Sequence, residues 1–104
     1  MNKNDILNET MNLAKKINNC LNHKNSTEFY LEIEECVNEF DKYKFIEKIS
    51  YICSRRYIEV SKTIGLFLTY DEDLQKDIMY TFLLNSKINE GTKKEQLEMK
   101  KNKN

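Results

Sequence analysis

Apolar positions recur at intervals of three and four along most of the chain, the spacing that places them on one face of an α-helix. In a first segment, from Asn4 to Asn22, this row consists of Ile6, Thr10, Leu13, Ile17 and Cys20. The polar stretch HKNST predicts a link, and Asn25 with Glu28 has the spacing of a capping box at the next helix start. That helix is predicted from about Ser26 to Asp41, and its inner row is Phe29, Ile33, Cys36, Val37 and Phe40.

The third segment keeps the helical period for longer than any other. Its apolar row runs through Phe45, Ile49, Ile52, Cys53, Tyr57, Val60, Ile64 and Phe67. We expect either one helix that continues to about Ile64 or two shorter helices that separate near residues 54–56. Gly65 predicts a helix end, and Thr69 with Glu72 has capping-box spacing for a last helix from about Tyr70 to Ser86. The inner row of that helix is Leu74, Ile78 and Phe82.

These segments predict an all-α fold. The chain has 104 residues, no proline and only two glycines, so it lacks the turn residues that a series of short strands requires. We therefore predict a single domain over residues 1–87, a small antiparallel four-helix bundle, with five helices if the third segment breaks near residues 54–56. Residues 88–104 contain few apolar positions and are predicted to be a flexible, disordered, charged C-terminal tail.

Residues 58–78 include the spacing Ser61-x-x-x-Gly65-Leu66, which is that of a helix-turn-helix that reads DNA. The second helix of such a unit would carry Asp71, Glu72 and Asp73 towards phosphates, and these acids oppose binding. Seventeen basic and seventeen acidic residues also cancel over the chain, whereas domains that bind nucleic acid carry a basic excess. We do not expect a nucleic-acid partner, and we keep a small DNA-associated regulator with a degenerate helix-turn-helix as the alternative function.

Residue types that support catalysis are sparse. The single histidine, His23, is predicted to be an exposed loop residue, and the three cysteines, Cys20, Cys36 and Cys53, lack metal-binding spacing and are predicted to be buried thiols. We expect no catalytic residue, no cofactor and no metal ion, so the protein is predicted not to be an enzyme. The longest apolar run of the chain is short, and the N-terminal residues lack the apolar core of a signal peptide. We therefore predict a cytoplasmic protein without a membrane partner.

Charge changes sign from one predicted helix to the next. Residues 25–41 hold six acidic and no basic residues, whereas residues 42–62 hold six basic and two acidic ones. Either neighbouring helices attract each other, or the acidic helix presents a carboxylate face to a basic partner through Glu28, Glu32, Glu35 and Glu39. Because tyrosine and arginine are enriched in interfaces, a second predicted partner-binding patch is formed by Tyr51, Arg55, Arg56 and Tyr57.

In size, lysine-rich helical composition and charged tail, the chain is broadly similar to small bacteriocin immunity bundles and to phage-encoded proteins that interfere with the host. This resemblance is one of architecture and implies no particular residues. We predict a non-enzymatic protein-binding module: an inhibitor, an immunity or adaptor protein, or a small subunit of an assembly. Its partner would be another protein, for which a basic surface is one expectation. A homodimer is another, because apolar residues such as Leu66 and Leu84 lie off the main rows.

Overall fold

The computed structural model describes residues 2–86, so the tail predicted for residues 88–104 lies outside it. The helices are α1 (Lys3–Cys20), α2 (His23–Glu39), α3 (Lys42–Arg55), the short α4 (Lys62–Gly65), a 3-10 turn η1 (Phe67–Thr69) and a last α-helix over residues 72–86. Within residues 2–86 there is no β-strand. The predicted all-α bundle is confirmed, in its five-helix form.

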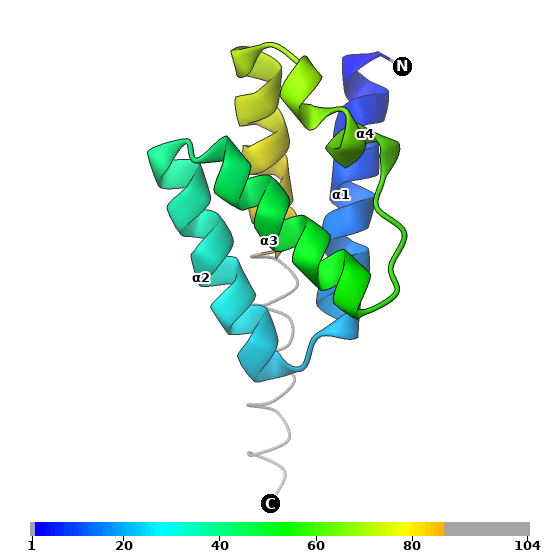
Figure 1. Ribbon diagram of the computed structural model, residues 1–104, viewed down its shortest axis with the longest axis vertical. Helices are drawn as coiled ribbons and strands as arrows, with labels where there is room; N and C mark the ends of the chain where they lie inside the picture. The colour runs from blue at the N-terminus through cyan, green and yellow to red at the C-terminus, as the bar shows by residue number, and fades with distance from the viewer. Residues whose placement is uncertain (1, 87–104) are drawn as a thin grey trace, which may run out of the picture.

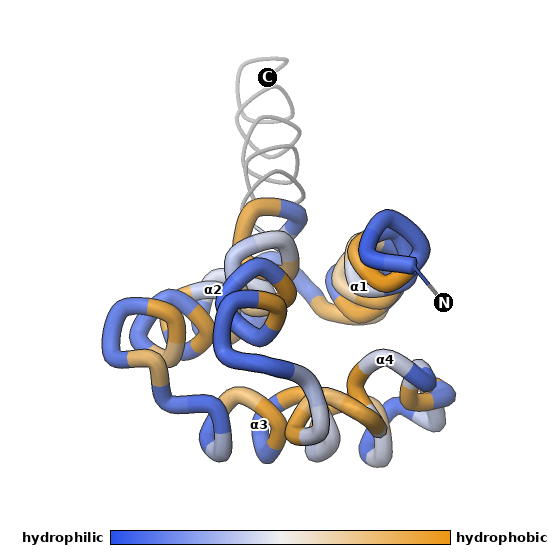
Figure 2. Tube along the Cα trace, turned by 90° about the horizontal axis from the view of Figure 1, so that it is seen from above, coloured by the Kyte–Doolittle hydropathy of each residue, from blue (hydrophilic) through white to orange (hydrophobic). Residues whose placement is uncertain are grey.

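The helices form two layers. In Figure 1, α1 and α2 run in opposite directions, and α3 slants from the top of α2 towards the lower end of α1, while helix 72–86 stands behind α3. Figure 2 shows that α3 and α4 lie together on one side of the three longer helices and that the hydrophobic parts of the trace turn towards the centre. The antiparallel arrangement follows from the short links between consecutive helices.

Helix 72–86 packs against α2 and α3 through one aromatic cluster. The Phe82 ring centre lies 6.0 Å from that of Phe29 on α2 and 5.5 Å from that of Phe45 on α3, both in edge-to-face geometry. Phe45 in turn lies 5.2 Å from Phe67 of η1. Phe45, Phe67 and Phe82 are fully buried, so they provide much of the apolar area that holds the layers together.

Polar contacts fix the same helix along its length. Near its end, the Ser86 carbonyl accepts a hydrogen bond from Asn18 Nδ2 of α1 at 3.4 Å, and Asn18 Oδ1 accepts one from Ser26 Oγ of α2 at 2.5 Å. In the first turn, Gln75 Nε2 donates a hydrogen bond to the Phe67 carbonyl at 3.1 Å. Because buried polar groups need partners, these bonds specify how the helices are aligned.

Two helices begin at residues other than those predicted. Asn22, not Asn25, caps α2, because its side chain accepts a hydrogen bond from the Asn25 N–H at 2.8 Å, so the predicted HKNST link is the first turn of α2. Asp71, not Thr69, caps the last helix, since its carboxylate accepts a hydrogen bond from the Leu74 N–H at 2.8 Å. Asparagine and aspartate are strong N-caps, and each satisfies a free N–H of the first turn.

The unbroken version of the third segment is wrong, and the break near residues 54–56 is confirmed. α3 ends at Arg55, and the chain then extends to Ser61, whose hydroxyl caps α4 by accepting from the Ile64 N–H at 3.2 Å. Glu9 of α1 also stabilises the start of α4, because its Oε1 accepts a hydrogen bond from the Thr63 N–H at 2.9 Å. Val60, predicted on the inner row, is 41% exposed in this link.

The aromatic cluster yields a stability prediction. Replacing Phe45 with Ala should lower the free energy of unfolding by about 3–5 kcal/mol, because it leaves a cavity beside the two buried rings of Phe67 and Phe82. Chemical denaturation followed by circular dichroism measures the loss, and Phe45→Leu should show a smaller one. Tyr43→Ala is the control, because that ring is 67% exposed; its effect should stay within about 0.5 kcal/mol. Equal losses at Phe45 and Tyr43 would contradict the packing described.

Candidate functional site

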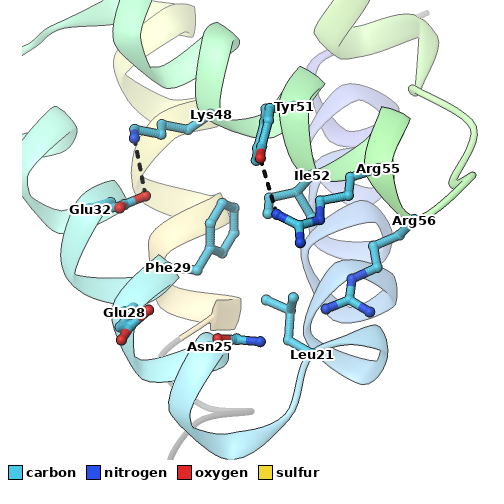
Figure 3. Close-up of a pocket in the computed structure, with 10 residues that line it drawn as sticks. All are labelled: Leu21, Asn25, Glu28, Phe29, Glu32, Lys48, Tyr51, Ile52, Arg55 and Arg56. Atoms are coloured by element: carbon cyan, nitrogen blue, oxygen red, sulfur yellow. Dashed lines mark hydrogen bonds and ion pairs between the residues drawn. The ribbon is translucent and has the colours of Figure 1, made fainter.

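A groove with a volume of about 260 Å³ lies between α2 and α3 (Figure 3). Its floor is apolar and consists of Leu21, which follows α1, Phe29 of α2 and Ile52 of α3. Leu21 and Phe29 also belong to the core. The other residues that line it are polar or charged: Asn25, Glu28, Glu32, Lys48, Tyr51, Arg55 and Arg56. The groove therefore combines an apolar base with charged walls.

The acidic wall of α2 is partly neutralised by lysines of α3. Glu32 Oε2 lies 3.5 Å from Lys48 Nζ, and Glu35 Oε1 lies 3.5 Å from Lys44 Nζ. The Glu35 carboxylate raises the pKa of the Lys44 ammonium. These contacts support the first explanation of the alternating charge, attraction between neighbouring helices, although partly exposed pairs contribute only about 0.2–1 kcal/mol each.

The wall of α3 carries an organised tyrosine and two arginines. Arg55 Nη1 donates a hydrogen bond to Tyr51 Oη at 3.1 Å, one helical turn earlier. The guanidinium carbon of Arg55 also lies 6.0 Å from the centre of the Tyr51 ring. Figure 3 shows Arg55 and Arg56 away from the Lys48–Glu32 pair, with Arg56 beside Leu21. Among residues 2–86 neither arginine forms an ion pair with a carboxylate.

Tyr57 ends α3 in a conformation that normally suits glycine. The Ile58 N–H donates to the Cys53 carbonyl at 2.8 Å, and the Tyr57 N–H donates to the Ser54 carbonyl at 3.3 Å. This pair of bonds closes a helix around a left-handed residue, and Tyr57 has φ 56°. Its side chain is 97% exposed, so contacts within residues 2–86 do not compensate the backbone strain.

Phe40 is a second left-handed residue at a helix end, but its side chain has a structural role in the core. It ends α2 with φ 49° and the same bond pattern, since the Asp41 N–H donates to the Cys36 carbonyl at 2.9 Å. Its ring, however, packs against the core. The aromatic side chain of Phe40 therefore stabilises the fold, whereas that of Tyr57 is held in solvent beside Arg55 and Arg56.

The groove unites residues that the sequence suggested as two separate sites. Glu28 and Glu32 of the acidic set face Tyr51, Arg55 and Arg56 of the second set across it. The remaining predicted residues, Glu35, Glu39 and Tyr57, lie outside its lining.

Sequence reasoning missed the apolar floor, because Phe29 and Ile52 were assigned to core rows. It also missed Lys48. The positions 48, 51, 52 and 55 have the spacing of one helix face, and this signal could have found Lys48.

Two expectations about reactive side chains need correction. Cys36 and Cys53 are buried as predicted, and burial raises the pKa of each thiol, but Cys20 is exposed at the end of α1. His23 is the first residue of α2 and is half-buried, so it is not an exposed loop residue. Periodicity alone could not place either residue, because both lie where a helix ends or begins.

Within residues 2–86, no three His, Cys, Asp or Glu side chains gather into a set that could hold a metal ion. None of the helices described has the length and apolar composition needed to cross a bilayer. Comparison of the chain with protein-family models, curated proteins and solved structures found no significant match.

The strained turn predicts that one substitution will stabilise the protein. Tyr57→Gly should raise the free energy of unfolding by about 0.5–1 kcal/mol, because the left-handed penalty of roughly 1–2 kcal/mol exceeds the entropy that a glycine loses on folding. Tyr57→Ala removes the ring but keeps the strain, so it should change stability by less than about 0.5 kcal/mol. Thermal and urea unfolding provide the measurement, and a destabilised Tyr57→Gly would show that the exposed ring stabilises the fold.

Burial predicts unequal thiol reactivity. With iodoacetamide under native conditions, Cys20 should react at least about tenfold faster than Cys36 and Cys53, because a buried thiol reacts only after local opening and stays protonated. Peptide mass spectrometry reads each site, and in urea all three should react at similar rates. Fast native labelling of Cys53 would place that residue nearer the surface than described.

Proposed function

We propose that the protein is a non-catalytic protein-binding module, acting as an inhibitor, an immunity or adaptor protein, or a small subunit of an assembly. Its binding surface would be the α2–α3 groove together with the turn at Tyr57. One observation carries the proposal: Arg55 and Arg56, without acidic partners among residues 2–86, stand beside an exposed aromatic residue in a strained backbone conformation. Strain of this kind is typical of functional positions.

The chemistry of this surface supports a protein partner. Tyrosine and arginine are enriched among the residues that dominate binding energy in protein interfaces. The volume of the groove, about 260 Å³, is below the roughly 300–1,000 Å³ typical of small-molecule pockets. A site of this size suits one or two side chains of a partner that also contacts the surrounding surface.

The local structure of residues 58–78 gives less support to the DNA-associated alternative. The helix that would brace a recognition helix is α4, which has only four residues, and an extended segment precedes it. Helix 72–86 begins with the exposed acids Glu72 and Asp73. Acidic residues at that position oppose contact with phosphates, so the proposal favours protein as the partner.

Charge removal at the arginines tests the proposal. Full-length Arg55→Gln/Arg56→Gln should recover its principal partner from a native host extract at least about tenfold less efficiently than the unmodified chain. A factor of ten corresponds to about 1.4 kcal/mol, within reach of losing one hydrogen bond made by a charged group. Quantitative mass spectrometry of the recovered proteins is the measurement.

The matched control is Lys15→Gln/Lys62→Gln, which removes the same charge from two exposed residues outside the groove. This variant should keep normal recovery. Tyr57→Gly should weaken recovery although it stabilises the fold, which separates binding from folding. Undiminished recovery by the arginine variant, or equal loss in both double variants, would refute the proposal.

A further inference from the structure

We propose that the groove accepts an acidic segment of the partner protein, with a carboxylate against Arg55 and Arg56 and a neighbouring apolar side chain on the floor. This inference rests on the proposed function and specifies the chemistry of the partner. It reverses the expectation from the charge pattern, in which the acidic helix α2 faces a basic surface.

The first step is that the acids of α2 are largely occupied. Glu32 and Glu35 are each 3.5 Å from a lysine of α3, so a basic partner would compete with existing ion pairs. Tyr30 Oη donates to Glu34 Oε2 at 3.0 Å. Of the carboxylates that line the groove, Glu28 alone has no ion pair within the described part of the chain. The acidic wall of α2 therefore offers little unpaired negative charge to a basic ligand.

The second step is that the two arginines of the α3 wall remain able to bind an anion. Three basic and two acidic residues line the groove, and the Lys48–Glu32 pair removes one of each. Arg55 and Arg56 then face the single charge of Glu28, which Figure 3 places on the opposite wall. Both arginines are exposed. A guanidinium presents a planar set of donors that matches the two oxygens of a carboxylate.

The third step concerns the floor. Arg56 lies beside Leu21, and Phe29 and Ile52 continue the apolar surface from there. A ligand that reached the arginines with a carboxylate would place a neighbouring residue over these side chains. Burial of an apolar side chain adds affinity that a free anion does not gain. The chemistry therefore favours a peptide in which Asp or Glu stands close to Leu, Ile, Val, Met or an aromatic residue.

The experiment selects ligands without assuming their sequence. A random twelve-residue peptide library displayed on phage is selected against the immobilised full-length chain and, in parallel, against Arg55→Gln/Arg56→Gln. Peptides enriched on the unmodified chain should carry an acid within a few positions of an apolar residue. A synthetic, labelled copy of the most enriched peptide should bind the arginine variant at least about tenfold more weakly by fluorescence anisotropy. Circular dichroism verifies that the variants are folded.

Glu28 provides a readout of opposite sign. Glu28→Gln should strengthen binding of the selected peptide by about two- to fivefold at low salt, because it removes the repulsion between the Glu28 carboxylate and the acid of the peptide. A basic ligand would instead bind Glu28→Gln more weakly. The same peptide with its acids changed to Gln or Asn should lose most of its affinity.

Other results would overturn the inference. Enrichment of basic peptides, no enrichment of acidic over neutral ones, or weaker binding by Glu28→Gln would each do so. Displacement of the peptide by mixed-sequence duplex DNA at equal charge would point to a polyanion site instead. If Arg55→Gln/Arg56→Gln loses the native partner while the selected peptides are basic, the proposed function stands and the acidic ligand falls.

Discussion

The fold depends on the burial of one helix among all the others. Phe82 of helix 72–86 meets Phe29 and Phe45 edge to face, and Phe45 carries the contact on to Phe67. These rings lie on α2, α3, η1 and helix 72–86, so none of these four elements can move away from the cluster without exposing aromatic area. Polar contacts such as the one between Asn18 and Ser86 then select one alignment among those that the apolar surface permits.

Ion pairs between the helices stabilise this fold less than the apolar packing does. Within residues 2–86, three ion pairs, one between Lys3 and Asp77 and two between α2 and α3, join helices that apolar packing already brings together. Each is partly exposed and contributes little to stability. Their larger effect is on the charge of the groove, because the Glu32–Lys48 pair leaves Arg55 and Arg56 opposite Glu28, the groove's only unpaired carboxylate among the described residues. The same packing that sets the distance between α2 and α3 thus decides the sign of the surface.

Periodicity predicted the parts of the fold that burial determines. The inner rows through Ile6, Phe29, Phe45 and Phe82 were correct inside the helices, because a buried face repeats with the helical turn. They failed at Cys20, Tyr57 and Val60, which lie at a helix end or in a link and are exposed. Helix boundaries were less predictable, since Asn22 and Asp71 compete with nearby residues of similar capping ability. Only part of the site could be predicted from the sequence, because residue chemistry indicated Arg55 and Glu28 but not that they belong together. That they line one groove depends on the angle at which α3 crosses α2, and the sequence pattern does not encode that angle in any local signal.

The central helix is also the last one in the described sequence, and this order has a consequence for biosynthesis. Phe29 leaves the ribosome more than fifty residues before its partner Phe82, so the nascent chain presents its apolar faces without the segment that will cover them. Collapse of the earlier helices alone would bury these faces only in part. Completion of the core must await the emergence of residues 72–86 from the ribosome, and in that interval the chain is most exposed to chaperones, proteases and aggregation.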